Sequence, residues 1–285
     1  MKYRPSRTNK TRPPKRIPAK KAAGVPHRAG KIRIVRYLAA CGIASRRKAA
    51  DIVLEKRVKV NGQIVTDLSY GVDTRQDQVT VDGERLREVE LGLLLFYKPR
   101  LVLSTLSDPH GRKSVGSYLT SHFRSYVPVG RLDYESEGLM ILTNDGDLAN
   151  VLLHPKFELD RTYEVTCPMY VSDGQLRKLE QGVQLEDGPA RAELRMTHRT
   201  PERTVVEVSI REGRNRQVRR MFAAVDAEIS SLKRLRHGPF SIGALRPGQI
   251  RKLNEREFSK LREKVLSANE RPRAGKTFRK APRRP

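Results

Sequence analysis

The sequence has little that could cross-link the chain or anchor it in a membrane. Of its 285 residues two are cysteine and none is tryptophan. Cys41 and Cys167 lie far apart and neither has a CxxC partner, which excludes a disulfide scaffold and a cysteine-rich zinc module. No run approaches the roughly 18–20 apolar residues that a membrane-spanning helix needs. We therefore expect a protein without a membrane span, in a reducing compartment that we take to be the cytoplasm.

Sequence patterns for metals and nucleotide cofactors are also missing. The six histidines are scattered without the spacing of metal ligands. The chain has no Walker loop and no glycine-rich dinucleotide fingerprint after a strand. We expect neither a metal nor a cofactor.

Acidic residues are absent from both ends of the chain. Residues 1–31 hold eleven lysines and arginines and five prolines, and residues 271–285 hold seven more basic residues. The whole chain has 58 Lys+Arg against 32 Asp+Glu, a net charge of +26, and the part between the ends is basic as well. We expect disordered basic tails at 1–31 and 263–285. Such charge favours a polyanion, because cations that neutralise phosphates release counterions.

Two other uses of basic tails compete with this interpretation. Organelle transit peptides are also basic and free of acids, but five prolines would break the amphipathic helix that they form. A basic tail can also bind anionic lipid, yet neither tail interleaves large apolar residues with its charges. Nucleic acid is the partner that we expect.

Residues 32–86 predict a small module of two helices and a hairpin. The first helix would end at Gly42, and Ser45 would cap the second. Val58–Val65 alternates in polarity around Asn61-Gly62, a dipeptide typical of tight hairpin turns. The residues of this module that we expect to contact RNA are Arg33, Arg36, Ser45, Arg46, Arg47, Lys48, Lys59 and Asn61. A basic helical face that is merely solvated is the alternative.

Residues 90–262 predict a larger α+β domain. Strands are expected at 91–97, 127–129, 139–142, 163–166, 205–210 and 229–235, and helices at 147–153, 172–181 and 215–225. Since this order is mixed and not strictly βαβ, we expect a mixed, largely antiparallel sheet.

A candidate catalytic carboxylate lies in Gly130-Arg131-Leu132-Asp133. In an extended backbone Arg131 and Asp133 would share one face, with Leu132 on the other. The neighbouring cation would favour the charged form of Asp133, leaving a carboxylate ready to act as nucleophile or base. An ordinary surface ion pair is the alternative.

A second candidate is the arginine-rich segment 212–222. On a helix, Val218, Met221 and Phe222 would form an apolar stripe with guanidinium groups beside it. Arginine suits bidentate contacts with phosphate. We expect Arg214, Arg216 and Arg220 to bind RNA, with a solvated basic helix as the alternative.

Together these motifs resemble known families. IVRYLAACGIASRRKAADIVLEKRVKVNGQIV resembles the α-L RNA-binding domain of the ribosomal protein S-four type. GRLDYESEGLMILTNDG, LHPKFELDRTYEV and EGRNRQVRRMF resemble the RsuA/RluB branch of the pseudouridine synthases, isomerases that convert uridine to pseudouridine in ribosomal RNA. An α-L domain in front of the catalytic domain is the usual arrangement of that branch.

The resemblance implies roles for single residues. Asp133 would be the essential aspartate, Arg131 would help to hold the site, Tyr163 would stack on the target base, and Arg219 would pair with the aspartate. The residues that would line the substrate pocket are Val218, Leu132 and Lys98.

The resemblance also implies a substrate. Leu153-His154-Pro155 and the segment EQGVQLEDGPA are closer to enzymes of large-subunit rRNA than to the small-subunit enzyme. The expected partner is ribosomal RNA or a pre-ribosomal particle, and we expect a monomer because no amphipathic seam is left unused. A small-subunit enzyme and a non-catalytic rRNA-binding or ribosome-assembly protein stay open as alternatives. An RNA methyltransferase would need a glycine-rich cofactor loop, and residues 138–142 are an apolar strand instead.

Overall fold

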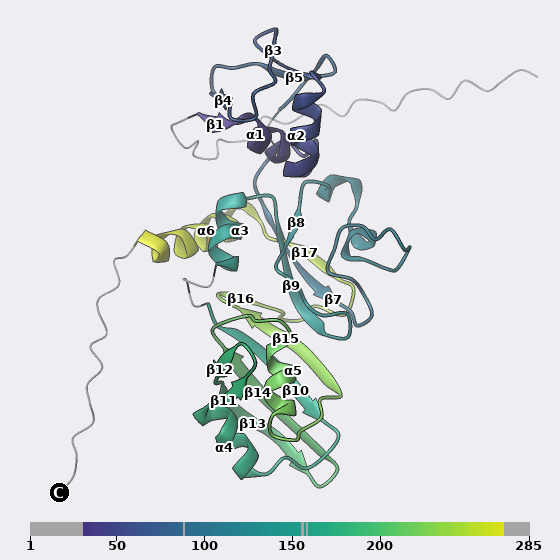
Figure 1. Cartoon of the computed structure of the whole chain (residues 1–285), viewed down its shortest axis with the longest axis vertical. Helices are drawn as coiled ribbons and strands as arrows, with labels where there is room; N and C mark the ends of the chain where they lie inside the picture. The colour runs from purple at the N-terminus through teal and green to yellow at the C-terminus, as the bar shows by residue number, and fades with distance from the viewer. Residues whose placement is uncertain (1–30, 88, 155–156, 158, 271–285) are drawn as a thin grey trace, which may run out of the picture.

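The structure is a computed structural model that describes residues 31–87, 89–154, 157 and 159–270 (Figure 1). Most of the two predicted tails lies outside these residues. Within the described ranges, no helix is both long enough and apolar enough to cross a membrane.

The N-terminal unit has two short helices on small sheets. Its elements are β1 (Ile32–Arg33), α1 (Ile34–Ala40), α2 (Arg46–Leu54), β2 (Val58–Val60), β3 (Gln63–Ile64), β4 (Gly71–Val72), β5 (Val79–Val81) and β6 (Glu84–Arg85). The strands β3-β2-β5-β6 form one antiparallel sheet, and β1 pairs with β4. Ile34, Leu38 and Val58 are fully buried, so helices and hairpin share one core. The predicted module is therefore present, with Ser45 as the cap of α2.

The larger unit is built on one long sheet. Its strands are β7 (Leu93–Lys98), β8 (Val127–Val129), β9 (Glu137–Thr143), β10 (Arg161–Cys167), β13 (Glu193–Thr200), β14 (Arg203–Ile210), β15 (Ser231–His237), β16 (Phe240–Ser241) and β17 (Ile250–Lys252). Their order is β13-β14-β10-β15-β9-β7-β17, with β16 on β15 and β8 on β9. The β9–β15 pair is parallel and the other pairs described are antiparallel. This confirms a mixed, largely antiparallel sheet.

Helices cover both faces of this sheet, which explains the apolar runs of its central strands (Figure 1). The covering elements are α3 (Gly146–Leu153), α4 (Asp173–Gln181), α5 (Gln217–Ala223), α6 (Glu255–Glu270) and the small hairpin of β11 (Val183–Leu185) and β12 (Gly188–Ala190). Residues of α4 and α5 pack with Phe96 and Met140 on one face. Residues of α3 and α6 pack with Leu95 and Ile141 on the other. Because successive side chains of a strand alternate between faces, β7 and β9 are buried on both.

The C-terminal boundary is further along the chain than predicted. The helix α6 runs to Glu270, and Val265 is buried in the core that α6 shares with α3. Arg262 of α6 also donates to Asp145, the cap of α3, with Nε 2.5 Å from Oδ2. The prediction of a disordered tail from residue 263 is therefore wrong for 263–270. The physical reason is that the apolar spacing of this helix continues past Leu261, so its later turns also pack on the core.

Two other predictions need correction. The helix predicted at 215–225 begins at Gln217, because Arg216 adopts a left-handed conformation with φ of 47° and caps it. No sequence pattern predicts β13, the β11–β12 hairpin or β17. Residues of β13 are mostly exposed, so the strand lacks the apolar signal by which the others were found.

Candidate active site and nucleic-acid interface

Asp133 lies in a loop between β8 and β9 that a serine holds in place. Ser104 Oγ donates to the carbonyl oxygen of Leu132 at 2.6 Å and accepts from the Leu132 amide at 3.0 Å. The Leu101 amide donates to the carbonyl of Tyr134 at 2.7 Å. The backbone on both sides of Asp133 is therefore fixed, as a catalytic side chain requires.

Two cations, Lys98 and Arg219, lie within the electrostatic reach of Asp133. Arg131 is exposed, whereas Asp133 is half-buried, and no ion pair between them occurs in the described part of the chain. The surface ion pair that was the alternative interpretation of this motif is therefore not found. Leu132 between them is buried, in agreement with the predicted alternation of side chains along this motif.

Lys98 is the last residue of β7 and is fully buried. Its Nζ donates to the carbonyl oxygens of Pro99 at 2.9 Å and Val102 at 2.8 Å. Burial lowers the pKa of Lys98 to about 8, while the charges of Asp133 and Glu137 partly oppose the shift. The buried Lys98 ammonium therefore places a positive charge near Asp133.

Arg219 extends from α5 toward the loop that contains Asp133. Its Nη2 lies 3.4 Å from Ser136 Oγ, and its buried Nε has no hydrogen-bond partner. Burial and the neighbouring Arg216 lower the pKa of the Arg219 guanidinium, while Glu135 and Asp133 raise it. Arg216 Nη2 lies 3.8 Å from Glu135 Oε2, which joins the start of α5 to the Asp133 loop.

Apolar side chains adjoin these charges. Leu132, Val218 and Tyr163 are buried in one cluster together with Met140, and none is more than 8% exposed. The structure thus brings together the predicted site residues Asp133, Lys98, Arg219, Tyr163, Leu132 and Val218, with Arg131 at the outside.

Three polar residues of this region are not among the predicted site residues. Ser104 belongs to a loop that no motif marks. Arg161 precedes Tyr163 by two residues, and burial lowers its pKa, with Arg234 adding to the shift. Arg234 is 3% exposed in β15. A signal for it was available, because Leu232 and Arg234 have the period-two spacing of an inward-facing strand side.

Two predicted RNA contacts of the arginine-rich segment are engaged inside the protein. Arg214 binds Glu212 Oε1 at 2.7 Å and Asp187 Oδ1 at 2.9 Å. Arg220 Nη1 and Nη2 bind both oxygens of Asp187, at 2.9 and 2.8 Å. The two guanidinium groups thus fix the β11–β12 turn against α5. Their predicted role in RNA binding is therefore not supported. The spacing of the arginines could not reveal these ion pairs, because only the fold brings Asp187 next to them.

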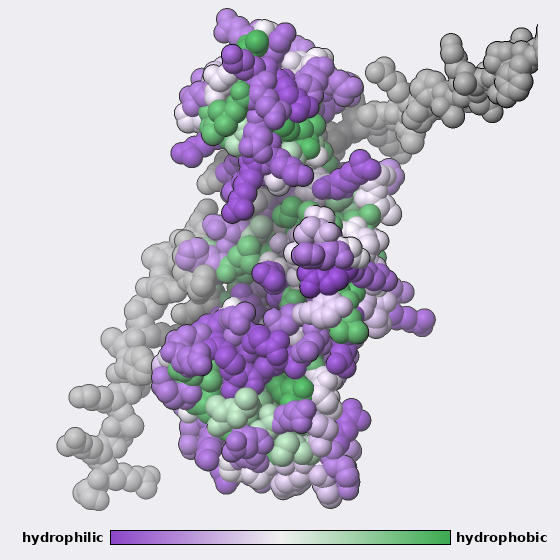
Figure 2. Space-filling view, turned by 45° about the vertical axis from the view of Figure 1, so that its right-hand side comes forward, coloured by the Kyte–Doolittle hydropathy of each residue, from purple (hydrophilic) through white to green (hydrophobic). Residues whose placement is uncertain are grey.

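The predicted RNA contacts of the N-terminal unit divide in a similar way. Arg36 pairs with Asp147 of the larger unit, the Ser45 hydroxyl caps α2, and the Asn61 amide group binds Asp77 and Gln78. The cations among them that stay exposed are Arg33, Arg46, Arg47, Lys48 and Lys59. Hydrophilic side chains predominate on the face of this unit in Figure 2. The exposed cations remain a prediction for RNA binding.

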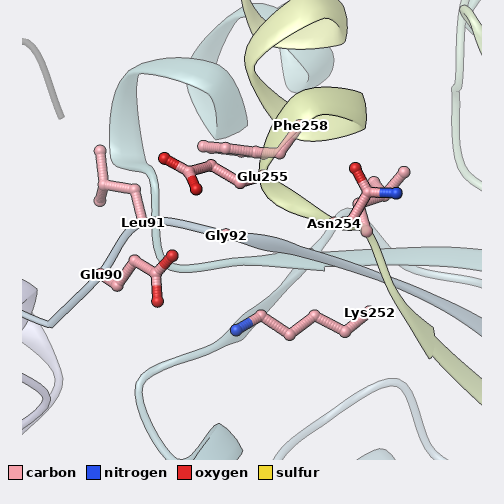
Figure 3. Close-up of a pocket in the computed structure, with 8 residues that line it drawn as sticks. Glu90, Leu91, Gly92, Lys252, Asn254, Glu255 and Phe258 are labelled. Atoms are coloured by element: carbon pink, nitrogen blue, oxygen red, sulfur yellow. The ribbon is translucent and has the colours of Figure 1, made fainter. Parts of the chain in front are cut away.

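A shallow pocket of about 250 Å³ lies elsewhere, between the start of β7 and the junction of β17 with α6 (Figure 3). Glu90, Lys252 and Glu255 line it together with Leu91 and Phe258. It contains none of the predicted site residues. Its two carboxylates make it unsuitable for a phosphate backbone.

Comparison with known proteins decides the family. A family model described as RNA pseudouridylate synthase matches residues 92–224, and one for the S4 domain matches residues 32–79. Ribosomal large subunit pseudouridine synthase B of Bacillus subtilis is 42% identical over 81% of this chain and 95% of its own length. The chain belongs to the RNA pseudouridylate synthase family.

Further comparisons agree with this assignment. Ribosomal large subunit pseudouridine synthase B of Haemophilus influenzae is 37% identical over 79% of this chain and 65% of its own length. A solved pseudouridylate synthase aligns with a TM-score of 0.57 and 27% identity, over 81% of this chain and 99% of that one. The resemblance read from the motifs is thereby confirmed, and the chain is an RNA pseudouridine synthase with an S4 domain in front.

Proposed function

We propose that this synthase isomerises a uridine of large-subunit ribosomal RNA and that Asp133 is its catalytic aspartate. The observation that carries the proposal is the setting of Asp133, near the buried Lys98 and the half-buried Arg219 and next to Leu132 of the apolar cluster that contains Tyr163. The names of the Bacillus and Haemophilus relatives support the large subunit as the source of the substrate.

The reaction breaks the bond between the ribose and N1 of uracil and makes a new bond to C5. An ionised carboxylate can start it either by attacking C1′ or by removing a ribose proton to give a glycal. Both routes need a carboxylate held free of its proton and a closed pocket that keeps the released base. Lys98 and Arg219 would serve the first need, and Leu132, Val218 and Tyr163 the second.

The target uridine must leave its stack before it reaches such a pocket. Extrusion of a base costs a few kcal/mol, which stacking on an aromatic side chain and backbone contacts offset. Tyr163 would supply the aromatic face. The S4 domain and the basic tails would supply contacts with phosphates, consistent with the net charge of +26.

Pseudouridine mapping tests this proposal. The pure protein is incubated with large-subunit and small-subunit rRNA, both naked and in particles, and pseudouridine is located by carbodiimide adducts and reverse-transcriptase stops. A new stop in large-subunit rRNA is the expected result. A stop confined to small-subunit rRNA would contradict the substrate. The absence of any stop would favour a non-catalytic rRNA-binding protein.

A further inference from the structure

Arg234 is a buried guanidinium without an anion. It is 3% exposed, and its Nε donates to the carbonyl oxygen of Leu139 at 2.8 Å. Its Nη2 is buried and has no hydrogen-bond partner. No carboxylate of the described residues forms an ion pair with Arg234. Glu164 pairs with the neighbouring Lys233 instead, with Nζ 3.7 Å from Oε1. Leaving a buried charge unpaired is unfavourable, so an acceptor is expected in the working state of the protein.

The strand register puts Arg234 beside the candidate active site. Arg234 lies opposite Tyr163 on β10 and opposite Gly138 on β9, and Gly138 in turn lies opposite Lys98 on β7. Side chains at paired positions leave the same face of a sheet. Arg234 therefore faces the side where Tyr163 packs with Leu132 and Val218.

The charges of this region are unbalanced. Lys98, Arg161, Arg219 and Arg234 are wholly or partly buried here, and the charge of Arg234 acts on both Lys98 and Arg161. Asp133 acts on both Lys98 and Arg219, Glu137 acts on Lys98 and Glu135 acts on Arg219. Among the described residues no carboxylate forms an ion pair with Arg161 or Arg234. The site as described thus carries an excess of positive charge, which would stabilise negative charge on a bound molecule.

The proposed reaction produces such charge on the base. When the bond between C1′ and N1 breaks, its electron pair stays with uracil, and the resulting anion spreads its charge over N1, O2 and O4. The base then turns, C5 forms the new bond to C1′, and C5 loses its proton while N1 gains one. No oxidant, reductant or co-reactant is consumed. The uracil anion is the species whose formation a buried cation would favour.

We propose that Arg234 is a further catalytic residue, whose Nη2 donates a hydrogen bond to a carbonyl oxygen of the detached uracil and stabilises its negative charge. This inference rests on the proposed isomerisation. A phosphate of the RNA backbone is the competing acceptor. The base is favoured because Nη2 is fully buried, and a base that enters the closed pocket reaches such an atom more readily than a phosphate held outside.

Substitution of Arg234 tests the proposal. Single-turnover pseudouridine formation and the Kd for the rRNA fragment are measured for Arg234→Gln and Arg234→Lys. Losing a donor to a developing anion should lower the rate of Arg234→Gln about 10²–10³-fold with the Kd within about twofold. Arg234→Lys should fall between this variant and the wild type, because it keeps the charge without the guanidinium geometry. If Arg234→Gln does not fold, Arg234→Lys carries the test against the wild type.

The control variant is Arg236→Gln, which removes an exposed arginine two residues along the same strand. It should keep the rate within about twofold. A rate of Arg234→Gln equal to that of this control would overturn the proposal. So would a loss of Kd as large as the loss of rate, which would assign Arg234 to a phosphate.

A substrate change separates a catalytic from a structural role. Fluorine at C5 stabilises the anion of uracil, so consumption of a target 5-fluorouridine should depend less on Arg234 than reaction of uridine does. Equal losses with both substrates would indicate a structural defect and contradict the proposal. If the wild type modifies no uridine at all, the proposed function fails instead, and the two failures are distinguishable.

Discussion

Arg36 of the S4 domain forms an ion pair with Asp147 of the catalytic domain, with Nη2 2.9 Å from Oδ1. Asp147 lies in the first turn of α3, where a negative charge is favoured by the helix dipole. Arg46 lies close by, since a Cβ added at Gly146 would be 3.2 Å from its Nη2. Arg36 is thus engaged by the catalytic domain, whereas Arg46 lies near that domain but stays exposed and forms no ion pair among the described residues.

Arg36 and Arg33 should therefore differ in RNA binding. Arg33→Gln removes an exposed cation and should weaken binding to an rRNA fragment, with the slope of log K against log salt reduced by about 1. Arg36→Gln should leave that slope unchanged, because the Arg36 guanidinium is already paired with Asp147. Fluorescence anisotropy at several salt concentrations measures both slopes. Equal changes in the two variants would refute this division of roles.

The Arg36–Asp147 ion pair should contribute little to the free energy of unfolding. The two side chains are 42% and 35% exposed, and pairs of this kind contribute at most about 1 kcal/mol. A double-mutant cycle of Arg36→Gln and Asp147→Asn should therefore give a coupling energy below about 1 kcal/mol in urea unfolding. A larger coupling would mean that the pair is buried when the protein is in solution.

The N-terminal tail should act through charge alone. Removing residues 1–31 takes away eleven cations and no acid, so binding should weaken and its salt dependence should flatten. The single-turnover rate at saturating RNA should stay unchanged. A lower rate at saturation would show that the tail takes part in the reaction itself.

Much of the fold follows from the sequence, and the exceptions have physical causes. The apolar runs of β7 and β9 and the cap at Ser45 are local signals, and each was found. The strand β13 has no such signal because its side chains are mostly exposed.

The candidate site was predicted less completely, because charge pairing is not a local property. The motifs pointed to Asp133, Tyr163 and Arg219 and to the pocket residues Lys98, Leu132 and Val218, but not to Ser104, Arg161 or Arg234. The link of Arg214 and Arg220 to Asp187, and that of Ser104 to Leu132, join segments far apart in the chain. No spacing rule predicts such contacts.

Gly138 should be far less replaceable than Gly62. Both have positive φ, 104° and 85°. An added Cβ at Gly138 would lie 2.6 Å from the Arg234 amide nitrogen, whereas nothing lies within 4 Å of one at Gly62. Gly62→Ala should destabilise by about 1 kcal/mol, the cost of the backbone conformation. Gly138→Ala should destabilise by at least about 3 kcal/mol, because β9 and β15 must separate. Similar unfolding midpoints for the two variants would contradict this.

Lys98 should make stability depend on pH. Its pKa is lowered to about 8 in the folded protein from an ordinary value of 10.5. Between these values the unfolded chain binds more protons, so the contribution of Lys98 to the free energy of unfolding rises with pH, by at most about 3 kcal/mol. Below pH 8 the full destabilisation that comes from the lowered pKa of Lys98 is present. Lys98→Met should abolish this part of the slope, whereas Lys252→Met, at an exposed position, should not. Parallel curves for Lys98→Met and the wild type from pH 8 to 10.5 would rule the shift out.

The central claim is that Asp133 carries out the isomerisation, and release of tritium from rRNA labelled at C5 of uridine measures it directly. The hydrogen at C5 is lost when the base is reattached through that carbon. Asp133→Asn should release no tritium above background while its Kd for the RNA stays within a few-fold, because the change removes one carboxylate and no phosphate contact. Asp160→Asn, at an exposed aspartate paired with Arg211, should release it at the wild-type rate. Near-normal release by Asp133→Asn would contradict the account.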